Sequence, residues 1–206
     1  MDATRWHDRF LGGAICLDFI NTIERLGTRQ EEDRFTSYGA ILAWSMIRGT
    51  MPPEALSRLR DKANADPAGA HEAWRAGVGL RRTLRRLMTA IMEGKHTELM
   101  LDLFNRRLAL LPAEPPITFQ GGVFRHHLTG ETFDEPLRPV MWSAVALLTE
   151  NQTDRVGQCQ AENCRYLFLD LSRNQSRRWC SADSCGNRER VRRAYRAEKV
   201  EPASGL

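Results

Sequence analysis

Two short segments bounded by cysteines decide how the C-terminal part of this chain folds: Cys159-Gln160-Ala161-Glu162-Asn163-Cys164 and Cys180-Ser181-Ala182-Asp183-Ser184-Cys185. Each segment has four residues between its cysteines, and fifteen residues separate the two pairs. This pattern is typical of a tetrahedral zinc site, because a short loop directs two thiolates at one ion. The residues between the pairs are enough for a hairpin that brings the second pair to the same ion. Four thiolates leave no position for a catalytic water. The spacing therefore predicts one structural Zn²⁺ held by Cys159, Cys164, Cys180 and Cys185.

The rest of the sequence fits a chain that stays in a reducing compartment. The N-terminus has acidic residues and no apolar core of a signal peptide, and no stretch is apolar for the length of a membrane span. We therefore expect a cytoplasmic protein whose cysteines are thiols or metal ligands rather than disulfides. The fifth cysteine, Cys16, lies in an apolar run and is predicted to be an ordinary core thiol.

The positive charge of the chain is concentrated around the cysteines. The 206 residues carry a formal net charge of +4, and residues 155–199 contain eleven Lys or Arg against five Asp or Glu. A basic segment attached to a nearly neutral body predicts a polyanionic partner, most often nucleic acid. A solvated, arginine-rich surface is the alternative that charge alone leaves open.

Upstream of the cysteines the sequence predicts a mainly α-helical domain with one small β-hairpin. Hydrophobic residues make up 42% of the chain, which is enough for a packed core. Apolar residues at helical spacing, with capping residues and prolines between them, predict helices over 12–23, 36–48, 53–64, 67–93, 96–111 and 139–151. Two short strands, 117–120 and 123–128, flank Gly121-Gly122. The domain organisation expected is 1–153 for the helical domain, 154–200 for the zinc module and 201–206 for a flexible tail.

Within the zinc module we expect a treble-clef-like order of loop, hairpin and helix. Residues 165–170 read as one strand, 177–180 as the returning strand, and Cys185 to about Lys199 as the last helix, with Ser181 as a plausible cap. Val191, Ala194 and Tyr195 are spaced to form an inward stripe of that helix, packed on Tyr166, Phe168 and Trp179. Because so short a module has little core, metal binding should supply much of its folding free energy.

The basic residues of the module are the candidate DNA contacts. The predicted face of the last helix steps through Arg188, Arg192, Arg196 and Lys199, and other arginines flank it or lie in the hairpin. Such a row suits a helix lying along a DNA groove, with guanidinium groups on phosphates and one on a guanine. The alternative is that Arg188 braces the finger and the others are solvated. The full set of candidate DNA-binding residues is Arg173, Arg177, Arg178, Arg188, Arg190, Arg192, Arg193, Arg196 and Lys199.

Two stretches resemble a known pair of domains. Residues 172–181, Ser-Arg-Asn-Gln-Ser-Arg-Arg-Trp-Cys-Ser, followed by Cys185-Gly186-Asn187-Arg188, resemble the CGNR zinc finger, and Gly12-Gly13 with Leu17-Asp18-Phe19-Ile20-Asn21-Thr22 resembles the ABATE domain. Ala182 stands where Met is expected, and Glu189-Arg190 where Lys often ends the motif, but neither is a ligand. The resemblance implies a bacterial, stress-induced transcription regulator that binds zinc and DNA.

Asp18 and Asn21 are the candidate residues for a ligand pocket. They lie three apart in an apolar segment, and buried polar groups need partners, so capping or bracing a neighbouring loop is the alternative. The helical domain is expected to sense a small-molecule effector or to mediate association, including as a homodimer. No nucleophile–base pair or nucleotide-binding fingerprint is found, so we do not expect an enzyme.

Two other functions stay open at this point. The finger could bind protein or RNA as an interaction module, or the helical domain could be an enzyme with the finger as a targeting tag. Salt-dependent binding with a sequence preference would favour DNA, and a deep pocket of titrating groups would favour the enzyme.

Overall fold

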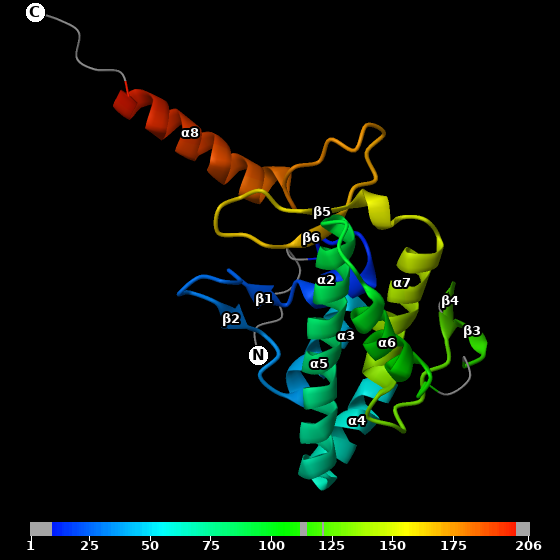
Figure 1. The fold of residues 1–206 in the computed structure, drawn as a ribbon. Helices are drawn as coiled ribbons and strands as arrows, with labels where there is room; N and C mark the ends of the chain where they lie inside the picture. The colour runs from blue at the N-terminus through cyan, green and yellow to red at the C-terminus, as the bar shows by residue number, and fades with distance from the viewer. Residues whose placement is uncertain (1–9, 112–114, 121, 201–206) are drawn as a thin grey trace, which may run out of the picture.

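The computed structural model describes residues 10–111, 115–120 and 122–200, without the side chains of residues 120 and 197–200. The tail expected at 201–206 lies outside these residues. Figure 1 shows a body of helices from which the last helix projects. In chain order the helices and strands are α2 (Ile15–Ile20), β1 (Ile23–Glu24), β2 (Glu32–Asp33), α3 (Tyr38–Arg48), α4 (Pro53–Ala65), α5 (Pro67–Met92), α6 (Glu98–Leu108), β3 (Ile117–Gln120), β4 (Val123–His126), α7 (Arg138–Thr149), β5 (Val156–Gln158), β6 (Leu167–Leu169) and α8 (Asn187–Val200).

The predicted helical N-terminal region is confirmed. Helix α3 begins after Ser37, whose side chain accepts a hydrogen bond from the Ala40 amide, and α5 begins after Asp66, which accepts from the Gly69 amide. The first helix is shorter than its apolar pattern predicts. Gly13 has a φ of +77° and stays outside the helix, and the chain turns after Ile20 into the small β1–β2 ladder.

Helix α2 lies at the centre of the core, between α5 and α7. Its Phe19 is fully buried and packs against Phe35 and Trp44, with ring centroids 5.0 and 5.3 Å away. Edge-to-face and tilted aromatic packing of this kind contributes energy beyond burial alone. The Cys16 thiol is fully buried beside Phe19, and this burial raises its pKa to about 11. None of the helices in the described part of the chain is long and apolar enough to cross a membrane.

The cysteine-bearing segment packs into the same core as the helices. Val156, Leu167 and Leu169 of the β5–β6 hairpin belong to one hydrophobic cluster with α2, α3, α5 and α7. The Leu169 amide donates to the Gly12 carbonyl over 2.7 Å. The predicted boundary near residue 153 falls in a short 3₁₀ turn, Thr153–Arg155, but apolar side chains from both sides of it fill one core.

The predicted pairing of the module hairpin is wrong. Strand β6 pairs with β5, which precedes the first cysteine, with Gly157 opposite Phe168. Residues 177–180 form no strand. The reason is that the second edge of β6 is already occupied, by the Gly12 carbonyl and the Asn21 side chain. Sequence spacing within the module cannot show this, because the competing partners come from the other end of the chain.

Candidate metal centre and basic helix

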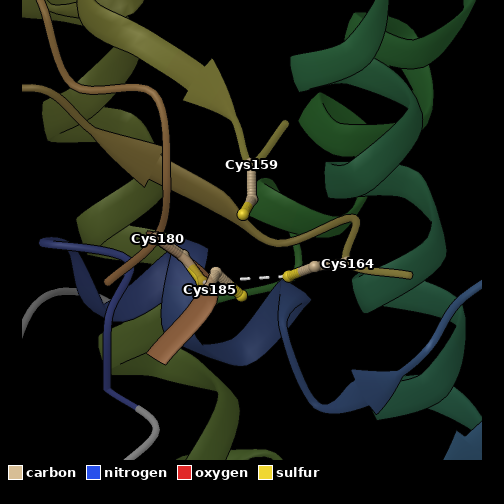
Figure 2. A group of neighbouring side chains, drawn as sticks. All are labelled: Cys159, Cys164, Cys180 and Cys185. Carbon is tan, nitrogen blue, oxygen red and sulfur yellow. Dashed lines mark hydrogen bonds between the residues drawn. The ribbon is translucent and has the colours of Figure 1, made fainter. Parts of the chain in front are cut away.

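The four cysteines of the two pairs meet at one point. Cys159 and Cys164 occupy the loop between β5 and β6, while Cys180 and Cys185 precede α8. All four side chains are buried, and their sulfur atoms lie within 4.8 Å of one another. Figure 2 shows the four sulfur atoms gathered between these segments. The structure thus brings the predicted ligand set together.

The sulfur spacing fits a tetrahedral ion. Zinc–thiolate bonds of about 2.3 Å place the sulfur atoms of a tetrahedron about 3.8 Å apart. The Sγ atoms of Cys164 and Cys180 are 3.8 Å apart, and those of Cys180 and Cys185 are 3.6 Å apart. The four cysteines are therefore poised to bind one metal ion, and no further side chain is needed to close its coordination.

The electrostatics of the cluster also favour a cation. Hydrogen bonding with Cys159 and the other two thiols, to which Arg188 adds, holds the pKa of Cys185 well below its usual range. The same mutual hydrogen bonds raise the pKa values of Cys164 and Cys180, in each case with Cys159 as the largest cause. Four neighbouring thiols cannot all ionise together without a compensating charge. A bound metal ion supplies that charge and lets all four act as thiolates.

Local hydrogen bonds hold the two cysteine pairs in place. The Cys159 amide donates to the Tyr166 carbonyl over 2.8 Å, and the Cys164 amide closes a tight turn onto Ala161. On the second pair, Ser181 caps a π-helical turn over Ala182–Gly186 by accepting from the Ser184 amide, as its expected capping role requires. Cys185 lies in this turn, directly before α8.

Arg188 supports the metal centre from outside. Arg188 lies one helical turn after Cys185, and its guanidinium donates to the Cys185 sulfur over 2.9 Å. Groups that hydrogen-bond to metal ligands orient them and tune their charge. Of the two roles weighed for Arg188, the structure shows the bracing contact.

Arg177 links the finger to the N-terminus. Its guanidinium donates to four backbone carbonyls and lies over the Phe168 ring at 4.4 Å. The four acceptors are the carbonyls of Leu11, Leu169, Trp179 and Cys180. The Arg177 amide also donates to Asp170. A guanidinium with this many internal partners is a structural residue of the finger, and sequence spacing gave no sign of it.

The packing of α8 differs from the one predicted. Val191 and Tyr195 are 61% and 58% exposed, so the expected inward stripe is not packed into a core. They lie on the same side of α8 as Arg188 and Arg192, and the four side chains line one open groove with Ala161 and Asn163. Arg192 is paired with Glu162 and, at 3.2 Å, with Glu189. On this side of the helix, the contacts with the finger are made by Arg192 to Glu162 and by Arg188 to Cys185, and not by a packed apolar stripe.

The remaining candidate DNA contacts differ in how many partners they have within the protein. Arg178 donates to Gln160 and lies over the Trp179 ring, so it is partly engaged. Arg190 donates to Asn187 on its own helix, and the 71% exposed Arg196 side chain is 4.0 Å from Glu162. Arg173 and Arg193 are exposed and form no ion pair with any described residue. The side chain of Lys199 lies outside the described residues.

Comparison with known proteins decides the family. Residues 155–198 match the CGNR zinc finger, and residues 13–151 match the ABATE domain, whose description is "putative stress-induced transcription regulator". Together the two matches account for most of the chain. This chain belongs to the ABATE/CGNR family. A search of curated proteins finds no match.

The ABATE residues Asp18 and Asn21 have internal partners. Asp18 accepts from the Gly12 amide at 2.8 Å and pairs with Arg48 at the same distance, while burial raises its pKa. Asn21 donates to the Leu167 carbonyl and accepts from the Leu167 amide, each over 2.8 Å. The cavity beside them has a volume of about 10 Å³, the space of a single water. In this structure Asn21 joins the ABATE and CGNR segments, whereas Asp18 holds Gly12 and Arg48 within the N-terminal part of the chain.

Proposed function

We propose that this ABATE/CGNR protein is a DNA-binding regulator of transcription in the cytoplasm, with a finger ordered by one structural Zn²⁺. The four cysteine ligands indicate zinc, because a closed tetrahedron of thiolates suits this metal. It leaves no coordination position open for a catalytic water or a substrate. Cys159, Cys164, Cys180 and Cys185 would hold the ion. Its contribution is structural, since it fixes the position from which α8 starts.

The observation that carries DNA binding is the exposed basic face of α8. Arg190, Arg193 and Arg196 recur every third residue and therefore lie along one side of the helix. They are exposed, and α8 extends away from the body of the molecule (Figure 1). A projecting helix with cationic side chains can lie along the phosphates of a DNA groove without a rearrangement of the core.

This assignment refines the sequence-based set of contacts. Arg188 and Arg177 are engaged with the finger itself, and Arg192 is held by two carboxylates. We therefore place the phosphate contacts on Arg190, Arg193 and Arg196, with Arg173 as an additional contact from the loop. Glu162 and Glu189 both pair with Arg192, and Glu162 also lies 4.0 Å from the exposed Arg196.

A selection of bound fragments from a random DNA library tests the proposal. The zinc-loaded protein should enrich a defined sequence, and a protein stripped of zinc by a chelator should lose the enrichment. Metal analysis of protein purified without chelators should give one zinc per chain. Enrichment of no DNA, with capture of a protein or RNA partner instead, would favour the interaction-module alternative.

A further inference from the structure

A groove lies at the end of the molecule remote from the cysteines, where α3, α4 and α5 meet (Figure 1). Its volume is about 490 Å³, within the range of small-molecule sites. Leu42 and Ala70 at its base are buried, and the half-buried Trp74 forms one wall. The groove is thus large enough for a small organic molecule and has an apolar base.

The aromatic wall is held in a fixed orientation. The Trp74 indole donates to the Phe35 carbonyl over 2.6 Å, and the His71 ring lies beside the indole, tilted by 52°, with centroids 5.1 Å apart. An aromatic surface fixed in this way can receive a flat apolar group without a loss of side-chain freedom on binding.

The charged lining of the groove is of one sign. Arg60 from α4 lines the groove and forms no ion pair with any described residue. By contrast, its neighbours on the same helix are engaged, since Arg58 donates to the Thr129 carbonyl and Lys62 to the Glu131 carbonyl. No Asp or Glu is among the described residues that line the groove. The first turn of α3, at Ser37 and Gly39, also opens onto it, and its amide dipoles favour negative charge.

We propose that this groove binds a small organic carboxylate with a flat apolar body, its carboxylate on Arg60 and its body between Trp74 and the base. Arginine suits this task because its planar fork can hold both oxygens of a carboxylate. The proposal gives the effector expected from the sequence a place other than Asp18 and Asn21. It does not depend on DNA binding, and its failure would leave the role of α8 untouched.

Three simple probes separate the parts of this recognition: benzoate has both the ring and the carboxylate, acetate has only the carboxylate, and benzyl alcohol has only the ring. In isothermal titration with the full chain, benzoate should bind saturably with a Kd of about 1 mM, as expected of so small a ligand. Acetate and benzyl alcohol should each bind at least about tenfold more weakly.

Matched variants locate the site. Arg60→Gln should weaken benzoate binding by about tenfold or more, while Arg75→Gln, an exposed arginine on α5 outside the groove, should leave it unchanged. Thermal melting of both variants checks that each remains folded. No saturable benzoate binding, equal binding of the three probes, or an equal effect of the two substitutions would overturn the proposal.

Discussion

The contact between Asn21 and β6 gives the sharpest test of the claim that the helices and the β5–β6 hairpin form one hydrophobic core. We consider Asn21→Leu, because leucine has the same branching and number of side-chain heavy atoms as asparagine and is bulkier, so it leaves no new space for water. The side chain of Asn21 forms both hydrogen bonds of the Leu167 peptide groups on that strand edge, and Leu167 is fully buried. The substitution removes both partners and leaves a buried amide and a buried carbonyl unsatisfied.

The expected size of the effect follows from these two groups. Each unsatisfied buried group costs about 1–3 kcal/mol. We therefore expect the free energy of unfolding to fall by about 3 kcal/mol, and the Tm of a chain of this size to fall by about 6–12 °C. Urea unfolding of the zinc-loaded protein, followed by circular dichroism, measures the first quantity directly.

An exposed asparagine supplies the control. Asn105→Leu on α6 changes the same chemical group on the surface and should alter stability by no more than about 0.5 kcal/mol. A loss below about 1 kcal/mol for Asn21→Leu would refute the reasoning, because the Leu167 peptide groups would then have other partners.

Three further outcomes are expected. Removing all residues after Thr153 should expose the core and produce dye binding and loss of cooperative unfolding, because Leu167 and Leu169 belong to that core; a sharply melting fragment would contradict it. Arg188→Gln should weaken zinc affinity by about 10–100-fold in a chelator competition, whereas unchanged affinity would show that the contact with Cys185 is incidental. Burial raises the pKa of Cys16 to about 11, so between about pH 9 and pH 11 the thiol ionises in the unfolded chain but stays neutral in the folded one, and the native protein loses stability as the pH rises. Cys16→Ala should therefore lose less stability than the native chain over this range. Parallel curves of unfolding free energy against pH for the two proteins would argue against the shift.

Much of the fold follows from local signals that the sequence carries. Helices such as α3 and α5 could be predicted because a capping residue, an apolar period and a terminating residue lie within one segment. The cysteine cluster could be predicted for the same reason, since short loops restrict where two thiols can point. These features depend on neighbours along the chain.

The features that were missed depend on contacts between distant parts of the chain. The pairing of β6 with β5, the bracing by Asn21 and the four carbonyl contacts of Arg177 all involve partners from elsewhere in the sequence or from the far side of a turn. The packing of α8 was mispredicted because hydrophobic periodicity assumes that an apolar stripe is buried. In this short basic module, Val191 and Tyr195 stay exposed, and the contacts of α8 with the finger include an ion pair with Glu162 and a hydrogen bond to Cys185.

The salt dependence of DNA affinity tests the central claim most directly. For the site enriched by selection, log K is measured against log salt for the native protein and for the triple variant Arg190→Ala, Arg193→Ala and Arg196→Ala, with zinc content verified in both. If all three arginines contact phosphates, the magnitude of the slope should fall by about 2.7, which is about 0.9 for each contact. An unchanged slope and affinity in the zinc-loaded variant would show that α8 is not the element that contacts DNA.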